Sequence, residues 1–336
     1  MMIFRRIVQS AVVMLSLVTG HGLTMGQQPK SAPENIAPAR TVKLNLIVTD
    51  RSNHSRDDVT KDEVQVFEGK VPQTVSTFAR DERPVNYVVA IDRSGSFKDL
   101  LSPALDAIKQ LINSNRDLDE TMLIGFVDSN KIETFQNFTS DKSKFVESMK
   151  LIRIEGGQSA VIDAIYLAVQ SAAAYKSGDS SIRRAVVLFS DGEDRVSYYN
   201  ADALVKLLRA KDVEVFVVGM VTQLDNTNGF IRQSPREAAE RLLNRVALET
   251  GGRVFFPKNI SALMQATGEI VHDLRAQYIV GYEPQDNTSN DNFRKVEVKI
   301  IVAPGREKSV AITKPGYFIT PPDIDGKENR KKKKAK

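Results

Sequence analysis

The sequence YVVAIDRSGS at residues 87–96 joins a continuous apolar run to a short polar turn. A continuous apolar run is typical of a parallel strand that is buried on both faces of a sheet. The turn that follows carries the carboxylate of Asp92 and the hydroxyls of Ser94 and Ser96, each two residues from the next. Oxygen ligands grouped in a tight turn at the carboxyl end of a buried strand favour the binding of a small, hard cation.

Four more apolar runs follow this strand and alternate with helical patterns. The runs predict strands at residues 121–127, 185–191, 213–219 and 253–256. Apolar stripes at helical spacing, and a Ser-x-x-Glu capping box at residues 234–237, predict helices over residues 105–112, 162–169, 204–208, 234–250 and 261–274. This alternation predicts an α/β fold with a doubly wound, mainly parallel sheet, whose ligands bind at the carboxyl ends of the strands.

The segments on either side of this region have a different pattern. Residues 41–84 and 276–319 contain short runs in which apolar and polar residues alternate, without helical patterns between them. Such alternation indicates strands with one buried face, and neither segment alone offers enough strands for an independently stable domain. We therefore predict that the two segments pair in space as one small antiparallel β domain, and that the α/β domain of residues 85–275 is inserted between them.

Two other polar motifs are predicted to reach the same sheet edge as Asp92. The sequence GGQS at residues 156–159 precedes the second predicted helix, and SDGED at residues 190–194 ends the third predicted strand. They would add the hydroxyl of Ser159 and the carboxylate of Asp191 to the oxygen atoms of the first turn. Mg²⁺ prefers a shell of oxygen ligands of this kind, in which some positions are kept by water.

Taken in order, the three motifs resemble the metal-ion-dependent adhesion site of the von Willebrand factor type A family, whose pattern is Asp-x-Ser-x-Ser, a distant Thr and a distant Asp. The resemblance covers residues 85–275, with a serine in place of the family's threonine. The metal ligands that it implies are Asp92, Ser94, Ser96, Ser159 and Asp191. It implies Mg²⁺ as the ion, with Mn²⁺ or Ca²⁺ as alternatives, and a partner protein that presents an acidic residue to the metal.

The flanking segments resemble a subgroup of secreted bacterial proteins with this domain that is abundant in acidobacteria. The resemblance rests on residues 48–50, 61–69, 277–282 and 314–317. The remaining charged residues near the motifs are expected to lie outside the metal site. Arg93 is expected to point away from the ion, Asp163 to face neighbouring backbone or water, and Glu193 and Asp194 to be solvated loop acids.

The composition excludes several kinds of chemistry. The chain has 336 residues, three histidines and no cysteine, so it has no disulfide, no cysteine nucleophile and no thiolate zinc site. It also lacks a Gly-x-Ser-x-Gly nucleophile elbow, a phosphate-binding Gly-x-x-x-x-Gly-Lys loop and a zinc-protease helix motif. These absences favour a binding module over an enzyme.

The ends of the chain account for its basic character. Residues 1–26 have the charged start, short apolar run and small-residue exit of an export signal, although an uncleaved membrane anchor is an alternative. Residues 27–40 have the composition of a linker, and residues 320–336 that of a disordered basic tail. The two arginines of the signal and the net six positive charges of residues 326–336 leave about −3 of the total +5 for residues 27–325.

We therefore predict an exported protein, periplasmic or secreted, with no transmembrane span after removal of the signal. Its predicted function is metal-dependent binding of an acidic residue on another protein. Two alternatives stay open at this point. One is a scaffold with a degenerate, metal-free site that binds through the β domain, and the other is binding of an anionic surface or nucleic acid through the basic tail at residues 331–334, although no specific nucleic acid is expected.

Overall fold

The computed structural model describes residues 41–224, 234–285, 292–301, 307–322 and 324. At its centre is a six-stranded sheet with the order β10-β9-β8-β5-β6-β7. All neighbouring strands of this sheet are parallel except β6 and β7, which are antiparallel. The strands are β5 (Val85–Asp92), β6 (Glu120–Phe126), β7 (Ile132–Thr139), β8 (Arg183–Ser190), β9 (Glu214–Gly219) and β10 (Val254–Phe255).

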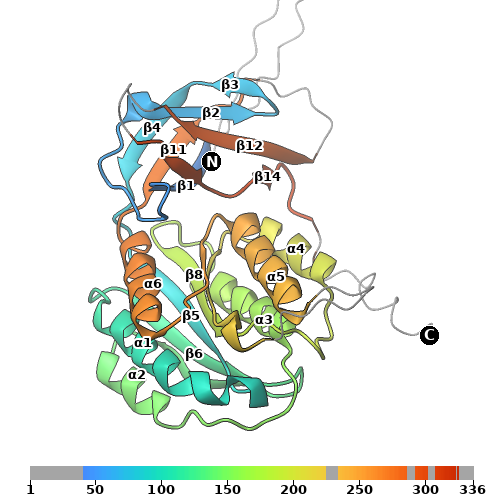
Figure 1. Cartoon of the computed structure of the whole chain (residues 1–336). Helices are drawn as coiled ribbons and strands as arrows, with labels where there is room; N and C mark the ends of the chain where they lie inside the picture. Colours follow the sequence, from blue (N-terminus) through green and yellow to red (C-terminus); the bar gives the residue numbers. More distant parts are fainter. Residues whose placement is uncertain (1–40, 225–233, 286–291, 302–306, 323, 325–336) are drawn as a thin grey trace, which may run out of the picture. The chain divides into compact units, whose positions relative to one another are not determined.

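Helices cover both faces of this sheet (Figure 1). One group consists of α1 (Leu101–Asn113), α2 (Lys142–Met149) and α6 (Ile260–Asp273), and the other of α3 (Val161–Ala174), α4 (Ala201–Ala210) and α5 (Pro235–Thr250). Each group forms its own core with the sheet. Val89 and Ile91 of β5 join the core under the first group, whereas Val88 and Ala90 join the core under the second, because successive side chains of a strand point to opposite faces. This explains why β5 is buried at every position.

The predicted α/β fold with a doubly wound, mainly parallel sheet is confirmed, and each predicted strand and helix has a counterpart. The structure adds β7 and α2, which the sequence analysis missed. Strand β7 lies at the sheet edge and is only partly buried, so it lacks the continuous apolar run of its neighbours. Helix α2 has eight residues and three buried positions, which gives only a short helical stripe.

The two flanking segments combine in two further four-stranded sheets, ordered β13-β1-β11-β4 and β14-β12-β2-β3. Each sheet takes strands from both segments. Strand β1 pairs with β11 and β2 pairs with β12, in both cases antiparallel. The strands are β1 (Val42–Thr49), β2 (Val64–Glu68), β3 (Val71–Gln73), β4 (Val75–Arg80), β11 (Tyr278–Tyr282), β12 (Phe293–Ile300), β13 (Val310–Ile312) and β14 (Gly316–Phe318).

These sheets enclose one apolar core. Leu44 and Val280 lie opposite each other in the first sheet, and Val66 and Val298 in the second, and all four side chains belong to this core. The prediction that N- and C-terminal segments together build the antiparallel part of the protein is therefore confirmed. We call this part the β module, and the part around the six-stranded sheet the α/β module.

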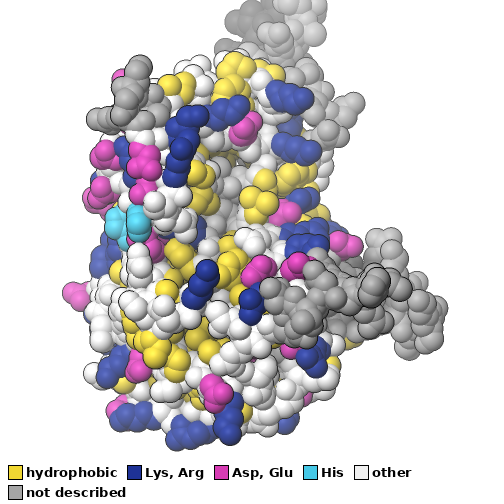
Figure 2. All heavy atoms as spheres, viewed as in Figure 1, with side chains coloured by type: hydrophobic (Ala, Val, Ile, Leu, Met, Phe, Trp, Pro, Cys, Tyr) yellow, Lys and Arg dark blue, Asp and Glu magenta, His cyan; other side chains and the backbone are white. Residues whose placement is uncertain are grey.

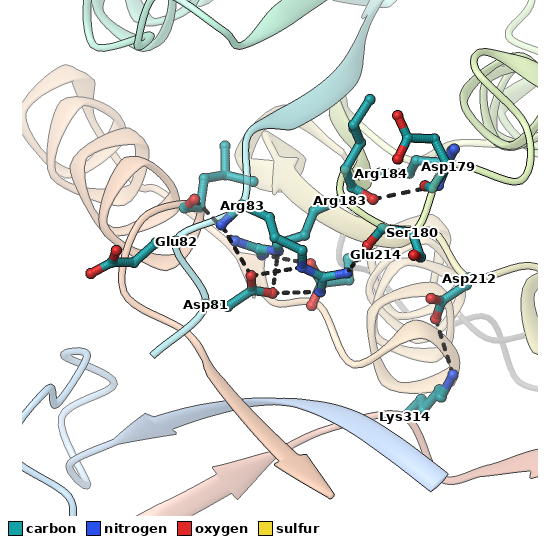
Figure 3. Close-up of polar contacts among 12 residues, drawn as sticks. Asp81, Glu82, Arg83, Asp179, Ser180, Arg183, Arg184, Asp212, Glu214 and Lys314 are labelled. Atoms are coloured by element: carbon teal, nitrogen blue, oxygen red, sulfur yellow. Dashed lines mark hydrogen bonds and ion pairs between the residues drawn. The ribbon is translucent and has the colours of Figure 1, made fainter. Parts of the chain in front are cut away.

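A buried polar cluster joins the two modules where the chain crosses between them (Figure 3). Asp81 follows β4, and its carboxylate accepts hydrogen bonds from Arg83 at 2.8 and 2.6 Å and lies 3.4 Å from the guanidinium of Arg183. Arg183, at the start of β8, also pairs with Glu214 of β9 at 2.8 Å. The backbone N–H of Asp81 donates to the carbonyl of Gln277 on the second crossing. The two crossings are thus bonded to each other and to the amino ends of two central strands.

A second polar contact lies between the loop after β1 and the end of α6. Arg253 donates to Asp273 of α6 at 2.7 Å and to the hydroxyl of Ser55 at 2.7 Å. The Ser55 hydroxyl in turn donates to Asp273 at 2.5 Å. Burial raises the pKa of Asp273 to about 6, and Arg253 opposes that shift. The loop of the β module is therefore fixed to the α/β module by charged groups that are largely removed from water.

Removal of everything after residue 275 is expected to unfold the remaining strands of the β module and to leave the α/β module folded. The reason is that β1 and β2 lose the antiparallel partners β11 and β12, together with half of their apolar core. Hydrogen exchange should show rapid exchange in residues 42–49 and 64–68 and slow exchange in β5 and β8, with the full chain as control. Slow exchange of β1 and β2 in the truncated chain would contradict the shared β module.

Basic and acidic side chains are interspersed on the face of the molecule shown in Figure 2, and they do not form one basic patch there. This agrees with the small net charge predicted for the part of the chain between its ends. Among the residues that the structure describes, no helix has both the length and the apolar character of a membrane span. The predicted export signal (residues 1–26), linker (27–40) and cluster of basic residues at 331–334 lie outside the described residues, as does most of the predicted tail.

Candidate metal centre

The candidate centre is built around Asp92, the last residue of β5, which is fully buried. Its Oδ1 accepts a hydrogen bond of 2.9 Å from the backbone N–H of Ser94, which shapes the turn after the strand. The same turn brings the hydroxyls of Ser94 and Ser96 to within 3.2 Å of each other. Ser96 is the second residue of the short 3-10 helix η2 (Gly95–Leu100), so its position is set by both the strand and the helix.

The loop before α3 supplies the next hydroxyl. Ser159 donates to both carboxylate oxygens of Asp92 at 2.9 Å and is almost fully buried. Its loop is attached to the first turn by a backbone bond from Gly95 N–H to the carbonyl of Gly157. Gly157 has a φ of 89°, a conformation that side chains disfavour, and a Cβ there would lie 3.0 Å from Val127. Glycine at this position therefore permits the approach that brings Ser159 to Asp92.

The loop after β8 supplies the second carboxylate. Asp191 accepts a hydrogen bond of 2.6 Å from the hydroxyl of Ser96, and its other oxygen accepts one of 3.0 Å from the N–H of Glu193. The turn requires Gly192, which has a φ of 78° and whose Cβ would lie 2.6 Å from Leu243. The structure thus brings all five predicted ligands, Asp92, Ser94, Ser96, Ser159 and Asp191, into one hydrogen-bonded group at the carboxyl edge of the sheet.

The electrostatics of this group suit a cation. Burial, and next the nearby charge of Asp191, raise the pKa of Asp92 to about 6, and burial also raises the pKa of Asp191. Among the described residues, neither carboxylate forms an ion pair with a lysine, arginine or histidine. A buried carboxylate is costly unless a positive charge compensates it. The charge of Arg195 partly opposes the shift at Asp191, without an ion pair between them. The all-oxygen donor set and the two carboxylates without an ion pair therefore fit a hard divalent ion such as Mg²⁺.

The described residues contain no cluster of three or more His, Cys, Asp or Glu side chains that could bind a metal ion. The group at the sheet edge has two carboxylates, and its other three side chains are serines. Hydroxyls are weaker ligands than carboxylates, so the ion would keep water molecules in part of its shell. That these five side chains bind a metal ion stays a prediction.

Ser190 is a member of this group that the sequence analysis did not assign. Its hydroxyl donates to Oδ2 of Asp92 at 2.8 Å and accepts from the N–H of Gly192 at 2.9 Å. It therefore orients the carboxylate and also fixes the turn that carries Asp191. The signal that could have identified it is a small polar residue at the end of an otherwise apolar strand, directly before the predicted Asp191.

Arg93 points away from the candidate centre, as predicted, and has a structural role behind it. Its guanidinium donates to Glu133 of β7 at 2.6 Å, to Glu155 and to the carbonyl of Arg153. The side chain is only 4% exposed and lies 4.8 Å from the ring centre of Phe135. Arg93 thus connects the turn of Asp92 to the loop that leads to Ser159.

The contacts of the acidic side chains near the site differ in part from those predicted. Asp194 is not a solvated loop acid, because its carboxylate accepts from the N–H of Ile162 at the start of α3 and from the hydroxyl of Ser197. Asp163 is buried and accepts from the backbone N–H groups of Tyr198 and Tyr199 at 2.7 and 2.8 Å, which agrees with the prediction that it faces backbone. Glu193 pairs with Arg195 at 2.6 Å. The two aspartates therefore fix the loop between Asp191 and α4.

Several solved structures resemble part of the chain. They include an aerotolerance-related membrane protein from Bacteroides fragilis, at 24% identity over 56% of this chain and 98% of its own, with a TM-score of 0.43. A pilus adhesin from Lactobacillus rhamnosus has 9% identity over 76% of this chain and 47% of its own, with a TM-score of 0.46. Proximal thread matrix protein 1 from the mussel byssus, with a zinc-occupied MIDAS motif, has 15% identity over 62% of this chain and 49% of its own, with a TM-score of 0.45.

These structural similarities are too weak to carry a functional argument, and no curated protein matches the chain. The match of the sequence to a family model is more specific than these structural similarities. Residues 86–269 match the family model of the von Willebrand factor type A domain, and this range is more than half of the 336 residues. It contains all five side chains of the candidate centre and the whole of the six-stranded sheet except the first residue of β5. The protein therefore belongs to the von Willebrand factor type A domain family.

Proposed function

We propose that this protein is a non-enzymatic binding protein that recognises an acidic residue of a partner protein through a divalent metal ion. The observation that carries the proposal is the hydrogen-bonded group of Asp92, Ser94, Ser96, Ser159 and Asp191, in which two buried carboxylates have no cationic partner among the described residues. Mg²⁺ is the proposed ion, with Mn²⁺ or Ca²⁺ as alternatives. Bound there, it would offer an exchangeable coordination position to a carboxylate of the partner.

The protein residues divide the work of such a site. Asp92 and Asp191 would supply two negative charges, and the hydroxyls of Ser94, Ser96 and Ser159 would supply neutral ligands. The negative charge of the ligands would therefore not exceed the positive charge of the ion. The hydroxyls of Ser96 and Ser159 donate to the two carboxylates, which leaves their oxygen lone pairs available to the ion. Ser190 and the backbone N–H of Ser94 hold Asp92 in place.

We further propose that the protein acts outside the cytoplasm, in the periplasm or secreted. The support for this is the charged and apolar pattern of residues 1–26, which is typical of an export signal.

Titration of Mg²⁺ into the purified protein tests the metal, and a pull-down tests the partner. We expect a binding isotherm in calorimetry that EDTA abolishes, and a rise in melting temperature with Mg²⁺, because the ion binds only the folded state.

The pull-down uses envelope and culture fractions with wild type and Asp92→Ala, each with and without EDTA. Partners should be retained only by wild type without EDTA, and identical partner sets in all four samples would refute the proposal.

A further inference from the structure

The loop after Asp191 presents apolar side chains beside the candidate metal centre. Val196 and Tyr198 are 38% and 52% exposed, although both are large apolar or aromatic residues. The backbone N–H of Arg195 donates to the carbonyl of Ser159 at 2.9 Å, so the loop begins next to a predicted ligand. Ser129, which follows β6, donates to the carbonyl of Val196 at 2.9 Å.

This loop is held in one conformation by groups that are removed from water. Asp163 is 3% exposed and accepts from the N–H groups of Tyr198 and Tyr199. The ring of Tyr199 stacks on Tyr166 of α3 at 3.8 Å, and Tyr198 meets the edge of Tyr199 at 5.3 Å. Because the backbone is already fixed, a partner that packs on Tyr198 would lose little conformational entropy of the loop on binding. Tyrosine is also one of the residues that most often dominate binding energy at protein interfaces.

A cavity of about 170 Å³ lies on the other side of the sheet edge. Its size is comparable with cavities of about 150 Å³ that hold one benzene ring. Asp99 and Leu100 at its rim belong to η2, the same short helix that carries Ser96. Its apolar lining consists of Leu100, Pro103, Met220, Pro257, Ile260 and Leu263.

The cavity is connected to the candidate centre through two chain segments. Besides η2, the N–H of Met220 donates to the carbonyl of Ser190 at 2.9 Å, directly before Asp191. Ile260 at the start of α6 is 63% exposed at the cavity. The cavity borders the core under α1 and α6, whereas Tyr199 packs on the core under α3, α4 and α5. Apolar groups are therefore available over both faces of the sheet, with the metal ligands between them.

We infer that the partner is a protein segment that carries an acidic side chain with apolar side chains on both sides of it. The acidic residue meets the metal, one apolar side chain enters the cavity beside Ile260, and another packs on Tyr198 and Val196. The inference rests on the proposed metal-dependent function and adds the chemistry of the residues around the acidic one.

A displayed library of short peptides with a fixed central glutamate and random flanks, selected on the full protein in Mg²⁺, tests this inference. Peptides released by EDTA are expected to be enriched in apolar residues on both sides of the glutamate. Tyr198→Ala and Ile260→Ser should each weaken binding of a selected synthetic peptide about tenfold or more. Leu248→Ser is the matched control, because Leu248 is 65% exposed on α5 and lines neither surface, and it should leave peptide affinity unchanged.

Mg²⁺ affinity, measured in parallel without peptide, separates the two proposals. Retained Mg²⁺ affinity in Tyr198→Ala and Ile260→Ser shows that these variants are folded. If Mg²⁺ binds but the EDTA-released peptides have no apolar preference, or no such peptide is recovered, the inference about the partner is wrong while the metal site stands. Equal peptide affinity of the two variants and wild type also overturns it. If Mg²⁺ does not bind wild type at all, the proposed function itself fails.

Discussion

Asp92→Asn is expected to lose the stabilisation by Mg²⁺ that wild type shows. In EDTA the variant should be at least as stable as wild type, because it removes one of two buried carboxylates that have no cationic partner among the described residues. At Mg²⁺ concentrations about one hundred times the dissociation constant, wild type should gain about 2.7 kcal/mol, and the variant nothing. Denaturant unfolding with and without Mg²⁺ measures both effects.

Asp141→Asn is the control for this experiment. Asp141 is exposed and caps α2 through its side chain, a role in which asparagine is equally effective. This variant should therefore keep both the stability and the Mg²⁺ response of wild type. A Mg²⁺ response in Asp92→Asn equal to that of wild type would show that the ion binds elsewhere.

Arg93→Met is expected to lower the free energy of unfolding by about 3 kcal/mol, a value at the lower end for removal of one partner from a buried ion pair. We use the lower end of this range because Glu133 and Glu155 are 53% and 31% exposed, so water can partly solvate their carboxylates once Arg93 is removed. The carbonyl of Arg153 also loses its donor. For a protein of this size we expect the melting temperature to fall by about 2 to 4 °C per kcal/mol.

Arg153→Met provides the comparison. Arg153 is an exposed arginine of the same loop and, within the described part of the chain, donates only to nearby carbonyls of its own segment. Its loss of stability should stay within about 0.5 kcal/mol. Urea unfolding of both variants measures the difference. Equal losses in the two variants would show that the bonds of Arg93 across β7 and the Ser159 loop do not stabilise the fold.

The sequence predicted the α/β fold and the grouping of the candidate ligands because both depend on local patterns. Buried parallel strands are continuous apolar runs, and their carboxyl ends meet at one edge, so Asp92 and Asp191 could be placed together without a structure. The same rule explains why Ser159, at the start of a helix on that edge, could be added to them.

The parts that were missed depend on long-range pairing. The partners of Arg93 are 40 and 62 residues away in the chain, and no local pattern connects them. Asp194 was wrongly predicted to be solvated because its acceptor role depends on the amino end of α3, 32 residues earlier in the chain. Strand β7 was missed because an edge strand needs no continuous apolar run.

The interrupted β module has a consequence for how the chain is made. During synthesis, β1 and β2 are translated before any part of the α/β module. Their partners β11 and β12 are translated after all of it. Until then, Leu44 of β1 has no partner strand and Val66 of β2 has only the short strand β3 beside it, and unpaired strand edges favour aggregation. Pairing across so many residues is also slow. The two sheets of the β module can therefore be completed only after the chain of the whole α/β module has been made.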